Sequence, residues 1–299
     1  MFNLIRMNLY SMVRARAFIV MVIVTVVVSV FNVAMLNMDL DYAVENGQQQ
    51  TEAEDIDIDA DEKGAGFTVT YEDEPVADAG VSLSIDDSWV NSDIHLLNLT
   101  EMIFSSGIFL ILVSVFIALY TNMEQSNGYI KNIAGQLPMR GLLSVSKLMG
   151  IAVELLIMMA LFTAATVISG KIYFGDKLVI DSIGTLLKYL GINYFLNLAF
   201  AAFIQMICTI ARGAGIGMTI GIFCCSGIAQ MIYSGISYLL SKIGLENVNI
   251  HKYTIEAQVM SVVSSSDSET LSRGVIVGAA YLIVCTAVSI FMLQKRDVK

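Results

Sequence analysis

The sequence has few charged residues and almost no proline, and both shortages limit the kind of protein it can encode. Only 15% of the 299 residues are charged, whereas 56% are hydrophobic, and the mean hydropathy is +0.70. A soluble domain has about 25% charged residues, so this composition indicates a chain that lies largely in lipid. The two prolines exclude a proline-rich linker.

The sequence also lacks the motifs of common catalytic, metal and nucleic-acid sites. Its four cysteines lie in apolar runs without C-x-x-C spacing, which argues against a disulfide framework or a zinc site and favours packing as small hydrophobic side chains. H-E-x-x-H and G-x-S-x-G are both absent, so an intramembrane enzyme is a poor hypothesis. No basic patch is interleaved with aromatic residues, so nucleic acid is not an expected partner.

Long apolar stretches fill most of the remaining sequence. A membrane-spanning helix needs about 20 mostly apolar residues. Six stretches meet this requirement: 17–37, 103–122, 148–169, 189–211, 216–240 and 274–293. The first follows three arginines as a signal peptide would, but its apolar core from Ala17 to Leu36 is longer than the ~7–15 residues of a signal. The prediction is one all-α integral membrane domain over residues 1–299, with six transmembrane helices.

The basic residues near the span ends predict the orientation. With the N-terminus inside, ten of them lie on the cytoplasmic side and six on the outer side, as the positive-inside rule favours. Both termini are therefore expected in the cytoplasm of a multi-pass protein of the plasma membrane.

Residues 38–97 form a strongly acidic loop, which this orientation places outside the cell. The loop holds 17 acidic residues against one lysine, a net charge of −16. Its field could concentrate cationic peptides or drugs, or the loop could be solvated without a ligand. The polar stretch 48–63 is predicted to be disordered, whereas GFTVTYED and VSLSIDDSWV alternate as two short strands would. An EF-hand beginning at Asp57 is excluded, because Glu62 and Thr68 replace the required glycine and glutamate.

A polar segment at 124–140 interrupts the apolar runs on the predicted cytoplasmic side. Ser126 or Asn127 can cap a helix start, and Gly135 followed by Pro138 can end it. The two turns between them gather apolar side chains on one face: Tyr129, Ile130, Ile133 and Leu137. A helix this short is not stable alone in water, so it is expected to dock either on lipid headgroups or in a protein groove. Gly128, Gly135 and several amide side chains favour the groove.

This segment carries a family resemblance. From Glu124 to Gln136 it resembles the first cytoplasmic loop of ABC-2-type permeases, the membrane subunits of many bacterial ABC exporters. Three other stretches are similar to the same family: MFNLIRMNLYSMVRAR to its interfacial elbow helix (2–14), HKYTIEAQVMSVVS to its extracytoplasmic segment before the last span (within 241–272), and LQKRDVK to its ending. The resemblance covers nearly the whole chain. The long acidic loop departs from the shortest members and leaves the substrate class open.

The resemblance implies a membrane subunit driven by a separate motor. In the family, the short helix is the coupling helix, seated in a cleft of an ABC ATP-binding subunit. No G-x-x-x-x-G-K-[ST] phosphate loop occurs here, so ATP and Mg are expected on that partner and no cofactor on this chain. The expected contact residues are Glu124, Gly128, Tyr129, Ile130, Asn132, Ile133, Gly135 and Gln136. For Glu124, an ordinary solvated acid at a helix end is an equal alternative.

The resemblance also implies a second permease copy, or a homologous permease, and export of a hydrophobic or cationic compound such as a peptide, an antibiotic or a lipid-like molecule. The alternative function is a membrane sensor or scaffold that uses the motion of an ABC ATPase without transport.

Polar and small residues inside the spans supply the remaining candidates. Glu154 lies about two turns into the third span, where an acid needs a partner or a watery cavity; it is expected either to line a substrate path or to brace helices. The same two roles are open for Asn193, Asn197 and Gln205 of the fourth span. Gly213, Gly217 and Gly221, spaced four apart, permit close helix packing, either within one subunit or at a dimer interface.

Overall fold

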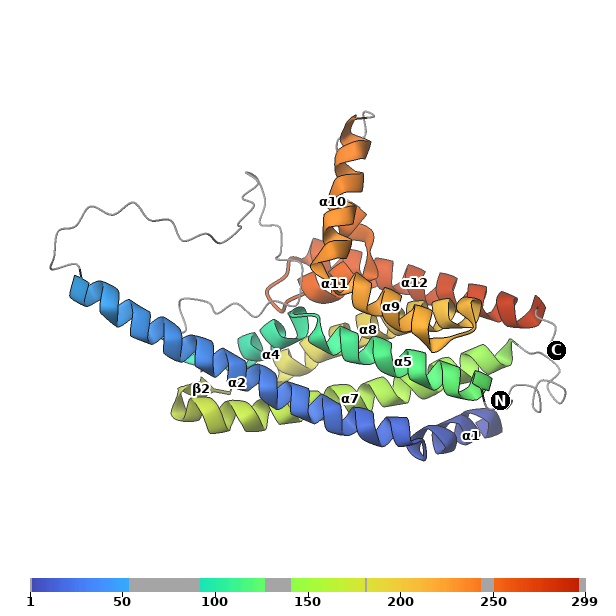
Figure 1. The fold of residues 1–299 in the computed structure, drawn as a ribbon, viewed down its shortest axis with the longest axis horizontal. Coiled ribbons are helices and arrows are strands. Elements are labelled where there is room, and N and C mark those ends of the chain that lie inside the picture. Colours follow the sequence, from blue (N-terminus) through green and yellow to red (C-terminus); the bar gives the residue numbers. More distant parts are fainter. Residues whose placement is uncertain (1, 54–91, 127–140, 181, 243–249, 296–299) are drawn as a thin grey trace.

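The computed structural model describes residues 2–53, 92–126, 141–180, 182–242 and 250–295. In these residues the chain forms a bundle of α-helices, most of which run side by side along the longest axis of the molecule (Figure 1). The α-helices are α1 (Phe2–Val13), α2 (Arg16–Ala53), α4 (Leu96–Ser105), α5 (Ile108–Ser126), α7 (Leu142–Phe174), α8 (Ile183–Ala211), α9 (Ala214–Cys224), α10 (Gly227–Lys242), α11 (Ile255–Ser261) and α12 (Ser268–Lys295). Two 3-10 helices, η1 (Gly175–Lys177) and η2 (Ile250–Tyr253), and two strands, β1 (Ile94–His95) and β2 (Leu178–Val179), complete the described elements.

Four helices are long and apolar enough to cross a membrane: Arg16–Tyr42, Leu142–Lys177, Ile183–Ala211 and Ser268–Lys295. They contain four of the predicted spans, 17–37, 148–169, 189–211 and 274–293. Their outward side chains are apolar; on α2, Ile23, Val27 and Phe31 are each more than half exposed. Soluble monomers rarely expose apolar patches of this extent to water. The all-α prediction is therefore confirmed, and the chain has the features of a multi-pass membrane protein, with four such helices in the described residues where six were predicted.

The predicted span 103–122 is a bent pair of helices rather than one straight helix. The axes of α4 and α5 meet at 52°. Gly107 sits at the bend with a φ of +77°, a conformation that residues with a Cβ rarely adopt. A Cβ on Gly107 would also collide with Met260 Cε of α11. The bend therefore requires glycine for its backbone conformation, since the flexible end of Met260 could move aside.

The prediction of one continuous span over 216–240 is wrong. α9 ends at Cys224, and α10 begins at Gly227 and leaves the bundle steeply (Figure 1). Between them, Ser226 donates a hydrogen bond from its hydroxyl to the carbonyl of Phe223 at 2.7 Å, one of the local bonds by which serine competes with helix continuation. Because the hydropathy is high on both sides of Ser226, it does not predict this break.

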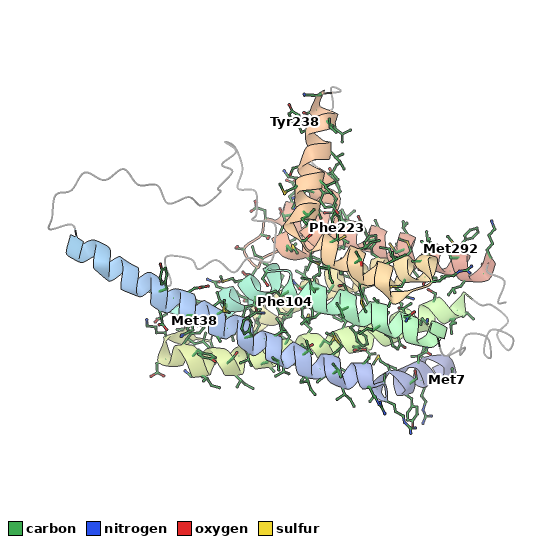
Figure 2. The ribbon with its side chains drawn as sticks, viewed as in Figure 1. Met7, Met38, Phe104, Phe223, Tyr238 and Met292 are labelled. Atoms are coloured by element: carbon green, nitrogen blue, oxygen red, sulfur yellow. The ribbon has the colours of Figure 1, made fainter. Side chains whose placement is uncertain are left out.

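Few contacts attach α10 to the rest of the protein. The Tyr233 hydroxyl donates a hydrogen bond to Glu256 Oε1 of α11 at 2.6 Å, and the Ile250 N–H donates one to Ser237 Oγ at 3.2 Å. Figure 2 shows Tyr238 far out on α10, away from the bundle. Met231, at 75% exposed, is the most exposed large apolar side chain in the described residues.

The acidic loop is shorter than predicted at its start. α2 remains helical to Ala53, so the prediction of disorder from residue 48 is wrong for residues 48–53. Residues 54–91, including both predicted strands, lie outside the described residues. A strand pair absent from the prediction follows them: β1 pairs in parallel with β2, with Ile94 opposite Leu178.

Buried aromatic rings join α4, α5 and α7 in the interior. The ring centroid of Phe104 lies 4.9 Å from that of Phe109 and 5.3 Å from that of Phe162, both edge-on. Edge-to-face pairs at this separation add to the stabilisation from burial. Next to them, the Ser29 hydroxyl of α2 bonds the carbonyl of Phe162 at 3.0 Å. α7 is therefore packed against α2 on one side and against α4 and α5 on another.

Candidate functional site

Residues 127–140 of the predicted coupling segment 124–140 lie outside the described residues, and so do its expected contact residues from Gly128 to Gln136. Glu124 is in the last turn of α5, and its side chain is not described. On either side of these residues, the structure describes α5 up to Ser126 and α7 from Leu142.

The first and last described helices both contact the start of α7. Asn8 of α1 donates a hydrogen bond from Nδ2 to Ser146 Oγ at 2.8 Å. Gly141 lies against Ile290 and Gln294 in the last turns of α12. The segment 127–140 is therefore attached at the end of the bundle that also holds α1 and the end of α12 (Figure 1).

The two asparagines of α8 form hydrogen bonds mainly along their own helix. Asn197 Nδ2 donates to the Asn193 carbonyl at 2.9 Å and to Asn193 Oδ1 at 2.5 Å. Asn193 Nδ2 in turn lies 3.3 Å from the Tyr189 hydroxyl, also on α8. Both side chains are fully buried. Asn197 Oδ1 has no hydrogen-bond partner within the described part of the chain.

Gln205 connects two helices. Its Nε2 donates to the Ser144 carbonyl at 3.1 Å and lies 3.2 Å from Ser144 Oγ, so it joins α8 to the first turns of α7. About three turns before Gln205 on α8, the Tyr194 hydroxyl donates to the Ala152 carbonyl of α7 at 2.9 Å. Within the described residues, Gln205 is the one of the four polar candidates in the spans whose side chain bonds another helix.

Glu154 is buried in the middle of α7 with a relative exposure of 1%. Neither carboxyl oxygen has a hydrogen-bond partner among the residues that the structure describes. The side chain therefore does not brace a helix pair through a hydrogen bond within this set. Because α7 is packed on several sides at this level, Glu154 faces the interior rather than lipid.

Two glycines of α9, Gly217 and Gly221, pack against neighbouring helices of the same chain. A Cβ on Gly217 would collide with Cys208 of α8, and one on Gly221 would collide with Ser114 of α5. Gly213, in contrast, has nothing within 4 Å of the position of an added Cβ. Gly217 and Gly221 thus allow α9 to approach α5 and α8, as small residues do in membrane helices.

Two buried acids at the opposite end of the bundle from segment 127–140 were not among the predicted site residues. Glu101 of α4 accepts a hydrogen bond from the Ser264 N–H at 2.7 Å, and Glu256 of α11 accepts one from Tyr233. Burial raises the pKa of Glu256, although the hydrogen bond from Tyr233 acts in the opposite direction. Burial lowers the pKa of His251 in the neighbouring η2. The sequence feature that could have indicated this region is Glu256, an acid inside the mostly apolar run YTIEAQVM. In the sequence, this run supports only the family resemblance.

No group of three or more metal-binding side chains occurs in the described residues. Comparison with known proteins finds no matching family model and no matching curated protein. The features that bear on function are the apolar bundle and the buried Glu154, whose carboxyl oxygens have no hydrogen-bond partner among the described residues.

Proposed function

We propose that this chain is the permease subunit of an ABC-2-type exporter, in the plasma membrane with both termini in the cytoplasm. A separate ABC ATP-binding subunit holds ATP and Mg and receives segment 124–140 as a coupling helix. Two permease copies, or one copy and a homologous permease, form the transport path. The cargo is a hydrophobic or cationic compound.

The observation that carries this proposal is that the start of α7, which follows residues 127–140 in the chain, lies beside α1 and the last turns of α12. The segment connects α5 to α7 at the end of the bundle where α1 and the last turns of α12 also lie. One cytoplasmic surface would then contain the N-terminal helix, the C-terminus and the coupling helix. A motor bound there could act on α5 and α7 at the same time, because the segment is continuous with both.

The weak polar links between α8 and α7 support a proposal in which the helices of the bundle change their packing. Hydrogen bonds from Gln205 and Tyr194 join α8 to α7, and such polar links contribute only about 0.6 kcal/mol each in membrane bundles. Two arrangements of similar free energy are what a nucleotide-driven transporter needs, since the motor can shift an equilibrium only by its differential binding to the two states.

The docking role is tested by purifying the tagged chain in mild detergent and measuring the co-purifying ATP-binding subunit and its ATP hydrolysis. Tyr129→Ala combined with Ile133→Asp removes the predicted apolar face and should reduce both signals at least tenfold. The matched control, Lys131→Ala combined with Ala134→Ser, changes residues away from the centre of that face and should leave both signals unchanged. Undiminished assembly in the first variant would refute the docking role.

Transport is separated from signalling by a second measurement. Reconstituted vesicles that contain the complex should accumulate a fluorescent cationic amphiphile, such as rhodamine 6G, when ATP is present on the motor side. A complex that hydrolyses ATP but moves neither this probe nor a neutral amphiphile would favour the sensor or scaffold function.

A further inference from the structure

Glu154 differs from the two other buried acids of the described residues in its lack of a hydrogen-bond partner. Glu101 and Glu256 each accept a hydrogen bond from a neighbouring segment. Both carboxyl oxygens of Glu154 are fully covered, and neither has a partner in the described ranges. Buried polar groups without water or a partner are exceptions in folded proteins, and an ionisable group inside a membrane helix is a functional candidate by default.

Contacts on both sides of Glu154 define its surroundings. One turn earlier, a Cβ on Gly150 would lie 3.3 Å from the Tyr120 hydroxyl oxygen of α5. Two residues earlier, the Ala152 carbonyl accepts the hydrogen bond from Tyr194 of α8. The carboxyl group therefore lies at the level where α7 contacts both α5 and α8.

The membrane-crossing parts of the neighbouring helices contain no charged residue. The sequence has no Asp, Glu, Lys or Arg in 17–38 of α2, 108–123 of α5, 189–211 of α8 or 274–294 of α12. Arg6 of α1 is exposed, and Glu101 of α4 is bonded to Ser264 at the other end of the bundle. Lys147 of α7 is seven residues before Glu154, about 10 Å along the helix axis.

Several uncharged titratable side chains belong to these elements: Tyr120 of α5, Tyr189, Tyr194 and Cys208 of α8, and Tyr281 and Cys285 of α12. None of them carries a positive charge that could compensate a carboxylate. An ion removed from water without a counter-ion costs far more free energy than a neutral carboxylic acid in the same place. A proton is also a ligand that needs almost no additional space in a packed site.

We propose that Glu154 is a proton-binding site inside the bundle. While α5 and α8 pack against α7, the carboxyl group holds its proton. When these helices separate and water enters, the O–H bond breaks, the proton passes to water, and a hydrated carboxylate is left behind. Closing of the bundle takes up a proton again. Only the change of packing rests on the proposed function, since the transport cycle supplies the second arrangement.

Infrared spectroscopy of the purified full-length chain in lipid nanodiscs tests the proton directly. At neutral pH, wild type minus Glu154→Gln should show the C=O stretching band of one protonated carboxylic acid, lost completely in the variant. A difference spectrum that instead shows the two bands of a carboxylate at neutral pH would overturn the proposal.

Two further variants secure the interpretation. Glu269→Gln, at an exposed acid in the first turn of α12, should remove carboxylate bands and no carboxylic acid band. Glu154→Leu removes the same carboxyl group without a new amide and provides the subtraction if the glutamine variant does not purify as one species. The measurement needs neither ATPase nor cargo, so failure to bind a motor would refute the proposed function and leave the proton site standing, and the reverse also holds.

Discussion

The two broken apolar segments of the protein, α4–α5 and α9–α10, differ in what holds each break. At the first, Gly107 has a positive φ and lies against Met260, and Glu101 of the same segment is bonded to Ser264. At the second, α10 leaves the bundle and is attached mainly through Tyr233 and Ser237. Both helices of the first pair have buried side chains along their length, whereas most of α10 is exposed.

This difference shows that a helix break can have opposite structural consequences. The bend at Gly107 lets two helices pack into one core, so it is fixed by that core. The break at Ser226 takes a helix out of the core, so α10 depends on a few polar contacts at its base. Segments with few buried contacts open locally at a lower free energy than the whole protein.

The largest expected effect is on the first break. Gly107→Ala places a Cβ at a positive φ, which costs about 1–3 kcal/mol, while the flexible end of Met260 moves aside. We expect a loss of about 2 kcal/mol. A thiol-reactive dye that reports exposure of the buried Cys208 and Cys285 should show a clearly lower thermal midpoint. An unchanged midpoint would mean that the bend is not fixed by the core.

The next effect concerns the base of α10. Tyr233→Phe removes the hydroxyl that bonds Glu256 and leaves a buried carboxyl with one partner fewer, which costs about 1–3 kcal/mol. Since the contact is local, amide hydrogen exchange in α10 should accelerate about tenfold per 1.4 kcal/mol, while exchange in α7 stays the same. Equal acceleration in both helices would show that α10 is part of the core and would remove the contrast between the breaks.

The pH should change the same contact. The pKa of Glu256 is raised mainly by burial, so folding favours its protonated form. Its contribution is fully present below the ordinary glutamate pKa of about 4.3 and is lost as the pH rises through the raised value. Exchange in α10 should therefore speed up over this interval in wild type and be less pH-dependent in Glu256→Gln. Equal slopes in the two proteins would exclude Glu256 as the cause.

The smallest effect has the opposite sign. Gly235 lies inside α10 with nothing within 4 Å of an added Cβ. Gly235→Ala should stabilise the helix by about 0.5–1 kcal/mol and slow amide exchange in α10 a few-fold. The same substitution at Gly221, where a Cβ would collide with Ser114, should lower the thermal midpoint, which provides the matched comparison within the core.

Sequence reasoning located the long helices well, because length and apolar composition alone define them. It failed at Ser226 and Gly107, where one side-chain hydrogen bond or one backbone dihedral decides the direction of the chain. It also ended α2 too early, since composition after residue 48 suggested disorder, whereas the helix continues to Ala53.

For the candidate site, the sequence identified residue types but not their partners. Gln205 and Ser144 are 61 positions apart, and no local pattern indicates that they meet. Asn193 and Asn197 are four apart, and their mutual bond was within reach of helix geometry. The lack of a partner for Glu154 is a property of the whole bundle, which only the packed structure shows.

The pairing of the short strands β1 and β2 holds two distant parts of the chain together at one end of the bundle. The pair joins the residues just before α4 to those just after α7. Beside it, Gly170 of α7 lies against Leu99 and Leu178. A rotation about this pair would displace the opposite end of α7 most, where Ser144 and Ser146 are bonded to Gln205 and Asn8. A force applied to the chain just before α7 would therefore act first on these two hydrogen bonds.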